Sequence, residues 1–140
     1  MTTIARNTAR ETRIRLACPA DAAAVCAIYA PYVRDTATTF DLEPPTVEEM
    51  RQKIATILEE RLVAEIECAD TRAADATSHV ETGDGEAFTV IGYSYASAFR
   101  PRKAYLHSIE TSVYLAPEAK GHGLGTRLYG ALESILRLQN

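Results

Sequence analysis

Three glycines occupy alternate positions, 121, 123 and 125, inside the stretch AKGHGLGTRLYGAL (residues 119–132). The stretch turns at once into an apolar helical pattern. The first N–H groups of a helix have no partner inside it and carry the positive end of its dipole. Since glycine has no side chain to hold a ligand away, this combination is typical of a pyrophosphate-binding turn. The alternative is a connector whose glycines only permit tight packing, and the glycines alone do not decide between the two.

Two common phosphate motifs do not fit this stretch. A P-loop requires G-x-x-x-x-G-K-[ST], which the chain lacks. A dinucleotide fingerprint requires G-x-G-x-x-G and an acidic residue about 20 positions later, which would fall beyond residue 140. We therefore expect neither ATP held by a P-loop nor NAD held by a Rossmann motif.

Cysteine and histidine spacing predicts no metal site. Cys18, Cys26 and Cys68 are odd in number and form no C-x-x-C pair, and His79 has no second ligand near it. Free thiols in a reducing cytoplasm are the expectation.

Length and charge favour one globular domain in the cytoplasm. The chain has 140 residues and a formal net charge of −4, which argues against nucleic acid or an anionic membrane as the main partner. No apolar run approaches the roughly 20 residues of a membrane span. Residues 1–12 are predicted to be a flexible leader and residues 13–140 the domain.

Apolar periodicity predicts an α/β protein with a mixed sheet. The expected order is one strand, two helices, three strands and one helix, at residues 13–17, 19 onward, 47–61, 62–67, 87–99, 105–116 and 124 onward. Residues 34–46 are expected to be a loop.

Local signals refine these elements. Pro31 should bend or end the first helix, Thr46 and Glu49 should form a capping box, and Gly92 should mark a bulge. The acidic residues 67–86 are expected to form a solvated hairpin insert or a disordered loop.

The glycine stretch resembles a known family. Lys120–Gly121–His122–Gly123–Leu124–Gly125 is similar to the [Q/R]-x-x-G-x-[G/A] segment of the GNAT superfamily of N-acetyltransferases, with lysine in the first position. The stretches IYAPYVRDTATTFDLEPPT, IGYSYASAFRPRKAY and AYLHSIETSVYLAPEAKGHGLGTRLYGAL resemble the phosphinothricin N-acetyltransferase branch. The resemblance covers roughly residues 13–138 without the acidic insert.

This resemblance implies acetyl-CoA as co-substrate and no metal. The strand before the glycines would pair its backbone with the pantetheine arm, at Val113, Tyr114 and Leu115. The pyrophosphate would lie on the turn, at Lys120, Gly121, His122, Gly123, Leu124, Gly125 and Thr126. His122 would contribute its amide, and a catalytic role for its side chain is the alternative. The N–H of Val113 is a candidate oxyanion donor.

The resemblance also places the general base at Glu110. A primary amine is mostly protonated at neutral pH, so a base must take its proton, often through water. Strand alternation sets Glu110 and Ser112 on one face and Thr111 and Val113 on the other. A carboxylate among apolar side chains holds a proton more readily than one in water, which suits a base. The alternative is a solvent-facing residue on a half-exposed strand.

The acceptor is expected to be a small amino-acid-like amine. Phe40 and Tyr105 match family positions near the acceptor, and Arg100, with Arg102 and Lys103, could attract a carboxylate or phosphinate. The alternative for these cations is a solvated hairpin tip. Tyr29 and Tyr32 are expected to be core residues.

The sequence departs from the family after the last helix. Family members continue with a further strand, a helix and a closing hairpin, so the fold is expected to be truncated. A homodimer could supply the missing wall of the site. The alternatives to a small-molecule acetyltransferase are a non-catalytic domain that binds CoA or a partner, and a protein or peptide acetyltransferase.

Overall fold

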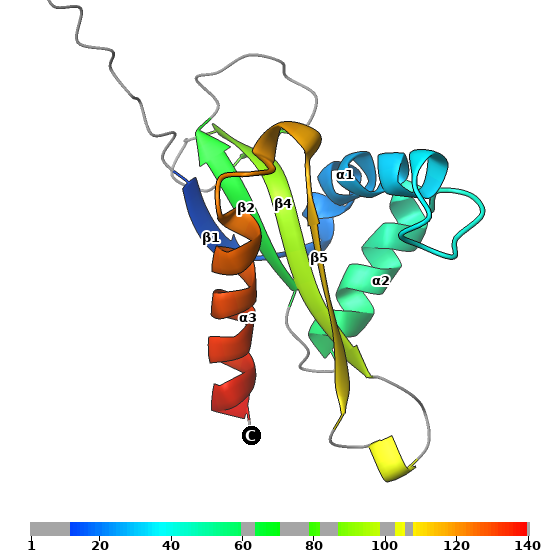
Figure 1. Cartoon of the computed structure of the whole chain (residues 1–140), viewed down its shortest axis with the longest axis vertical. Helices are drawn as coiled ribbons and strands as arrows, with labels where there is room; N and C mark the ends of the chain where they lie inside the picture. Colours follow the sequence, from blue (N-terminus) through cyan, green and yellow to red (C-terminus); the bar gives the residue numbers. More distant parts are fainter. Residues whose placement is uncertain are drawn as a thin grey trace, which may run out of the picture.

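The computed structural model describes residues 12–59, 64–70, 79–81, 87–98, 103–105 and 108–139. Its helices and strands follow the predicted order, with one short strand added (Figure 1). They are β1 (Thr12–Leu16), α1 (Ala22–Asp35), α2 (Val47–Glu59), β2 (Ala64–Asp70), β3 (His79–Glu81), β4 (Ala87–Ala98), β5 (Ile109–Leu115) and α3 (Leu124–Gln139). Short 3₁₀ turns lie at Pro19–Asp21, Lys103–Tyr105 and Pro117–Ala119.

The strands form one sheet in which β4 is central. The order runs β1, β2, β4, and the far side of β4 pairs with β3 near Thr89 and with β5 from Gly92 to Ala98. All pairs among the described strands are antiparallel, so the parallel pair that would make the sheet mixed is not among them. Helices and a sheet together confirm the α/β class.

A bulge interrupts the pairing of β2 with β4. Glu67 lies opposite Gly92 and Cys68 opposite Val90, so Ile91 is the extra residue. The Ile91 carbonyl instead accepts the N–H of Ala116, 2.8 Å away. The predicted bulge is thus present, one residue before the glycine expected to mark it.

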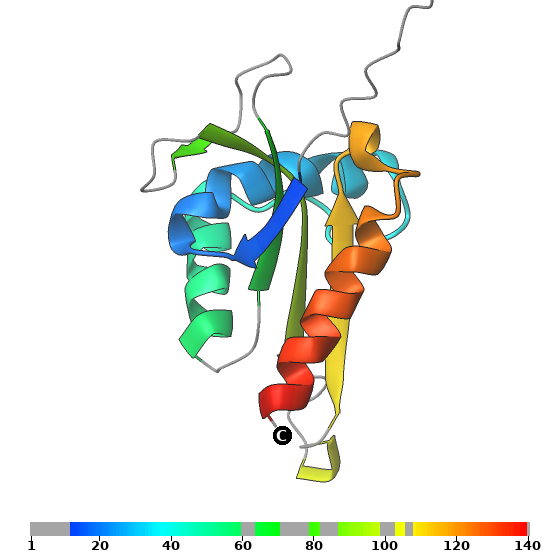
Figure 2. The same ribbon diagram turned by 90° about the vertical axis from the view of Figure 1, so that its left-hand side faces the viewer.

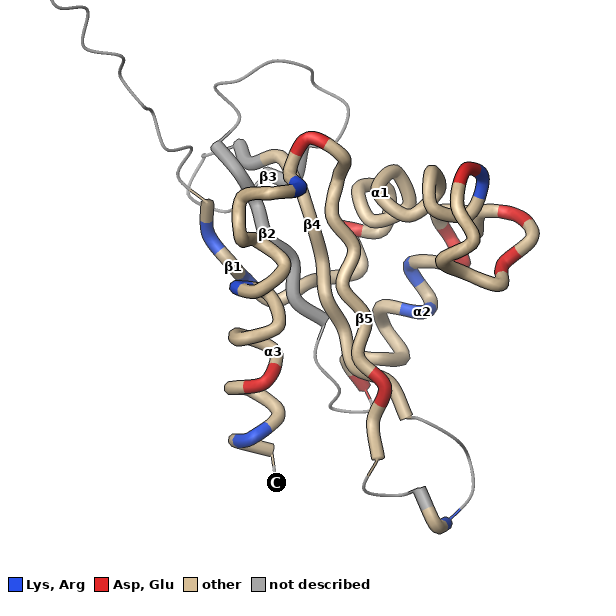
Figure 3. The backbone as a smooth tube through the Cα atoms, viewed as in Figure 1, with Lys and Arg blue, Asp and Glu red and all other residues tan. Residues whose placement is uncertain are grey.

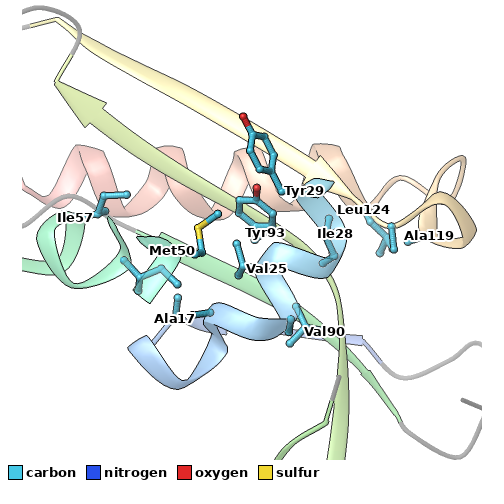
Figure 4. Close-up of a cluster of buried hydrophobic side chains, with 14 residues drawn as sticks. Ala17, Val25, Ile28, Tyr29, Met50, Ile57, Val90, Tyr93, Ala119 and Leu124 are labelled. Atoms are coloured by element: carbon cyan, nitrogen blue, oxygen red, sulfur yellow. The ribbon is translucent and has the colours of Figure 1, made fainter. Parts of the chain in front are cut away.

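Helices cover both faces of the sheet. Figures 1 and 2 show α1 and α2 on one face and α3 on the other. The larger core cluster lies on the α1–α2 side, where Val25, Tyr29, Met50 and Tyr93 are buried together (Figure 4). On the other side Leu132 of α3 packs on Ala96. Leu124, Leu128 and Leu132 are buried, which confirms the predicted apolar face of the last helix.

A buried ion pair ties β1 to the start of α1. The guanidinium of Arg15 donates two hydrogen bonds, of 2.7 and 2.9 Å, to the carboxylate of Asp21, which also accepts the N–H of Cys18 at 2.8 Å. Burial of Asp21 by itself raises the pKa of this carboxyl, but the bonds from Arg15 and Cys18 outweigh it and the pKa is lowered. Asp21 is therefore held ionised inside the fold.

Pro31 does not end α1, which continues to Asp35. A proline inside a helix removes one backbone hydrogen bond. Tyr32 and Val33, which follow it, pack against the core cluster, and this packing holds the last turn.

The capping box of α2 is confirmed. The N–H of Thr46 donates to the Glu49 carboxylate at 2.8 Å, and the N–H of Glu49 donates to the Thr46 hydroxyl at 3.2 Å. The described helix runs to Glu59, and residues 60–61 lie outside the described residues.

Three expected boundaries differ in the structure. β1 begins at Thr12, inside the expected leader. β2 extends to Asp70, past its expected end at residue 67, and β3 pairs antiparallel with β4, while residues 71–78 and 82–86 lie outside the described part. β5 begins at Ile109 rather than at residue 105, where a 3₁₀ turn lies.

Candidate functional site

The glycine turn joins β5 to α3. β5 ends at Leu115, a 3₁₀ turn follows, and α3 begins at Leu124. Gly121 and Gly123 have φ angles of 83° and 78°, in the left-handed region that glycine enters without strain. A Cβ added at either position would meet nothing within 4 Å. The backbone conformation, rather than close packing, therefore requires these two glycines.

The turn gathers unpaired donors at the N-terminus of α3. The first backbone bond of the helix runs from the N–H of Arg127 to the carbonyl of Gly123, at 3.2 Å. Within the described part of the chain, no protein group accepts the N–H groups of residues 121–126. His122 and Thr126 are exposed and Leu124 is buried. This arrangement fits an anion, and binding of pyrophosphate there stays a prediction.

One edge of β5 pairs with none of the described strands, and this open edge leads into the turn. In an antiparallel ladder, alternate residues direct their N–H and C=O groups to opposite sides of the strand. Because the N–H of Ala116 bonds to Ile91 of β4, Tyr114 also faces β4, and Val113 and Leu115 face away from it. Of the three residues whose backbone was predicted to pair with pantetheine, only Val113 and Leu115 therefore direct backbone groups to the open edge. Tyr114 can contribute only its side chain.

Tyr32 supports the junction of β5 and the turn. Its hydroxyl donates to the Leu115 carbonyl at 2.7 Å. Its ring meets the ring of Tyr114 edge-on, with centroids 5.2 Å apart, and the Lys120 ammonium lies 4.8 Å from its centroid. Tyr32 packs against the core cluster as expected, but it is half-buried and also contacts three residues around the candidate cofactor site. No local pattern could show this, because Tyr32 and Leu115 are 83 positions apart.

A layer of tyrosines covers the same face of the sheet. Tyr93 stacks on Tyr95 and on Tyr114, with ring centroids 6.2 and 5.4 Å apart. Tyr29 meets Tyr114 edge-on at 5.1 Å. Burial raises the pKa of Tyr93 and of Tyr114, so both hydroxyls stay protonated at neutral pH.

Tyr29 anchors the loop between α1 and α2. Its hydroxyl lies 2.7 Å from the Thr39 hydroxyl and donates to the Asp41 carboxylate. Burial, together with the bond to Asp41, raises the pKa of Tyr29 to about 12. Phe40, between the two anchored residues, is fully exposed.

Glu110 lies at the start of β5, opposite Ser97 of β4. Its side chain is exposed, so the apolar surroundings expected of a buried base are not found. Because residues two apart share a face, Glu110 lies on the same face as Ser112 and Tyr114. The structure thus sets it beside the tyrosine layer, away from the glycine turn.

The structure tests the predicted acceptor residues in part. Phe40 is exposed in its loop, and Lys103 is exposed in a 3₁₀ turn. Arg100 and Arg102 lie outside the described residues, and for Tyr105 only the backbone is described, in the same turn. These residues are not brought together by the part of the chain that the structure describes.

Neither a metal centre nor a membrane-spanning helix occurs in the described part of the chain. Within those ranges, no group of three or more histidine, cysteine or acidic side chains could hold a metal ion. None of the helices described there is long and apolar enough to cross a membrane.

Comparison with known proteins identifies the family. A model of the acetyltransferase (GNAT) family matches residues 41–140. A phosphinothricin N-acetyltransferase of Streptomyces coelicolor is 35% identical over 130 residues, which cover 93% of this chain and 68% of the relative. A phosphinothricin N-acetyltransferase of Alcaligenes faecalis is 37% identical over 108 residues, which cover 77% of this chain and 46% of the relative.

A solved structure agrees with these relatives. The phosphinothricin acetyltransferase of Sinorhizobium meliloti in complex with AcCoA is 34% identical, with a TM-score of 0.68. The match covers 86% of this chain and 57% of that one. The chain thus spans about half to two thirds of the length of these three relatives. Since the family model covers most of the chain and the fold agrees, the chain belongs to the acetyltransferase (GNAT) family.

Proposed function

We propose that the chain forms the acetyl-CoA-binding part of a cytoplasmic N-acetyltransferase that acetylates the primary amine of a small amino-acid-like substrate. Phosphinothricin and methionine sulfoximine exemplify this substrate class. The observation that carries the proposal is a junction within the described part of the chain. There the edge of β5 at Val113 and Leu115 pairs with no described strand, and the N–H groups of residues 121–126 have no described acceptor.

The junction fits acetyl-CoA in two ways. Val113 directs a backbone N–H and C=O to the open edge, where an amide-containing arm could pair, and Leu115 directs its N–H there. The N–H groups of the turn suit a pyrophosphate. Lys120, the residue before them, holds its ammonium over the Tyr32 ring, 4.8 Å from the centroid. When bound, acetyl-CoA supplies the acetyl group as a thioester.

Two groups of this chain would serve the reaction. Glu110 would accept the proton of the acceptor amine, through water, because its exposed carboxylate lies on the face of the tyrosine layer. The N–H of Val113 would donate to a carbonyl oxygen at the open edge. Support for the acceptor class comes from the names of the relatives, which are phosphinothricin N-acetyltransferases.

A second candidate is a non-catalytic domain of the same fold that binds CoA or a partner. It is favoured by the exposure of Glu110 and by the chain's 46–68% coverage of its curated relatives. Under this proposal acetyl-CoA would bind to the turn but no amine would be acetylated.

Thiol release with a panel of small amines, together with calorimetry of acetyl-CoA binding, tests these proposals. Binding with thiol release that depends on phosphinothricin supports the acetyltransferase. Binding without release from any amine supports the second candidate, and the absence of binding contradicts both.

A further inference from the structure

Lys53, in the middle of α2, faces the tyrosine layer. Its ammonium donates a hydrogen bond of 3.2 Å to the Tyr95 hydroxyl and lies 4.6 Å from the centroid of that ring. Figure 3 shows that the cations of α2 lie in one part of the helix. Lys53 is exposed. The bond therefore holds a charged group in place at the surface of the sheet face that carries Glu110.

Lys53 differs from Arg51 and Arg137, which form ion pairs within their helices. Arg51, on the same helix, pairs with Glu48, and Arg137 of α3 pairs with Glu133 at 2.6 Å. Among the residues that the structure describes, no carboxylate lies within ion-pair distance of Lys53. The charge of Lys53 is thus held by a neutral hydroxyl and an aromatic ring, and no carboxylate of the described ranges pairs with it.

Lys53 and Tyr95 retain hydrogen-bond donors that their mutual bond does not use. An ammonium carries three N–H donors, of which the bond to Tyr95 uses one. The Tyr95 oxygen accepts that bond, so its own O–H proton is free to donate. Tyr95 is held in turn by stacking on Tyr93, at an interplanar angle of 11°. Two anchored side chains can therefore donate together to one anion.

This donor pair lies close to the proposed base. Tyr95 pairs with Ser112 on β5, and Glu110 is the next residue on the same face. Tyr95 and Glu110 are therefore diagonal neighbours across β4 and β5, where backbones lie about 7–8 Å apart. An acceptor whose anion contacts Lys53 and the Tyr95 hydroxyl would therefore lie on the sheet face that carries Glu110.

The hollow beneath Lys53 and Tyr95 has little free volume. Lys53 and Tyr95 line a hollow whose other walls are apolar, among them Met50, Ile54 and Tyr93. About 20 Å³ is free for a water-sized molecule, which is room for about one water. An amino acid does not fit inside, so an acceptor would lie over the hollow, in contact with the exposed ammonium.

We propose that Lys53 and Tyr95 form the subsite that binds the anionic group, carboxylate or phosphinate, of the acceptor. The inference rests on the proposed acetyltransferase function for the identity of the acceptor. It assigns to α2 a role that the sequence suggested for the cations near residues 100–103.

Lys53→Met is the direct test, because methionine keeps the apolar stem and the helix propensity and removes the charge. We expect KM for phosphinothricin to rise about five- to tenfold with kcat within twofold, since an exposed charge pair is worth less than a buried one. Lys53→Arg should restore most of the loss. Arg51→Gln, on the same helix, is the matched control and should leave KM unchanged.

The anion is identified by the choice of acceptor. Norvaline carries only the carboxylate and 3-aminopropyl(methyl)phosphinate only the phosphinate, while n-butylamine carries neither. The acceptor whose KM responds to Lys53→Met carries the group that is bound. An equal rise for n-butylamine, or a rise for Arg51→Gln as large as for Lys53→Met, overturns the proposal.

Calorimetry of phosphinothricin binding in the presence of coenzyme A separates this proposal from the function itself. If no amine is acetylated, the acetyltransferase proposal fails. The subsite is still supported if Lys53→Met weakens phosphinothricin binding about fivefold or more. It is overturned if the wild-type chain does not bind phosphinothricin, or if both proteins bind it equally.

Discussion

Removal of one hydroxyl tests how the helix layer supports the glycine turn. Tyr32→Phe deletes the donor that lies 2.7 Å from the Leu115 carbonyl, while the ring stays beside Tyr114 and Lys120. A hydrogen bond contributes about 0.5–1.5 kcal/mol net. Because water can reach the half-buried site, we expect a loss of about 1 kcal/mol in the free energy of unfolding. For a chain of this size, that corresponds to a fall in Tm of about 3 °C.

A second substitution separates the contribution of the Tyr32 hydroxyl to stability from that of its ring. Tyr32→Leu also removes the edge-on contact with Tyr114, worth about 0.5–1.5 kcal/mol, and the contact with the Lys120 ammonium, worth about 0.5–1 kcal/mol. We therefore expect a total loss of about 2–3.5 kcal/mol. The step from phenylalanine to leucine should exceed the step from tyrosine to phenylalanine.

The assay combines urea unfolding with hydrogen exchange. If Tyr32 supports the turn, Tyr32→Phe should speed exchange of the amides of residues 115–126 about fivefold, and affect the C-terminal half of α3 less. Tyr129→Phe is the control, since Tyr129 is a half-exposed tyrosine of α3. The reasoning is refuted if Tyr32→Phe and Tyr129→Phe have the same stability and the same exchange in residues 115–126.

Other parts of the structure give three further predictions. Alanine at Gly121 or Gly123 places an L residue at positive φ, which costs about 1–2 kcal/mol. Calorimetry should therefore show that the affinity for acetyl-CoA falls about fivefold or more, and wild-type affinity in both variants would contradict the turn's role. Glu110→Gln should lower kcat about 100-fold or more without changing the dissociation constant of acetyl-CoA, and an unchanged kcat across the pH range rules out a base at this position. The pKa of Asp21 is lower in the folded chain than in the unfolded chain, where it is about 4. The charged carboxylate therefore stabilises the fold fully above about pH 4, and this stability is lost as the pH falls through the folded pKa. In urea unfolding from about pH 2 to 6, Arg15→Gln should flatten that dependence, and an unaltered slope would show that the ion pair is not its source.

Local signals predicted the elements that local interactions make. The capping box at Thr46 and Glu49 formed as expected, because both partners lie within one helical turn. The apolar spacing of Leu124, Leu128 and Leu132 gave the buried face of α3. The glycines predicted the turn, since positive φ is a property of single residues.

Local sequence signals could not predict the contacts between segments that are distant in the chain. The bond from Tyr32 to Leu115 joins α1 to β5, and the bond from Lys53 to Tyr95 joins α2 to β4. Pro31 was expected to bend or end α1, but packing of the residues after it against the core carries the helix on. The exposure of Glu110 depends on where β5 begins to pair with β4, which the strand's own sequence does not fix.

The central claim is that residues 121–126 and the open edge of β5 bind acetyl-CoA. An NMR titration of the ¹⁵N-labelled chain with acetyl-CoA tests it most directly, because each backbone amide reports on its own contact. We predict that the amide resonances of residues 121–126 and of Val113 and Leu115 shift together, with one dissociation constant, while those of Tyr114 shift less. Saturating acetyl-CoA that leaves these amides unchanged, or that shifts a different surface, would contradict the account.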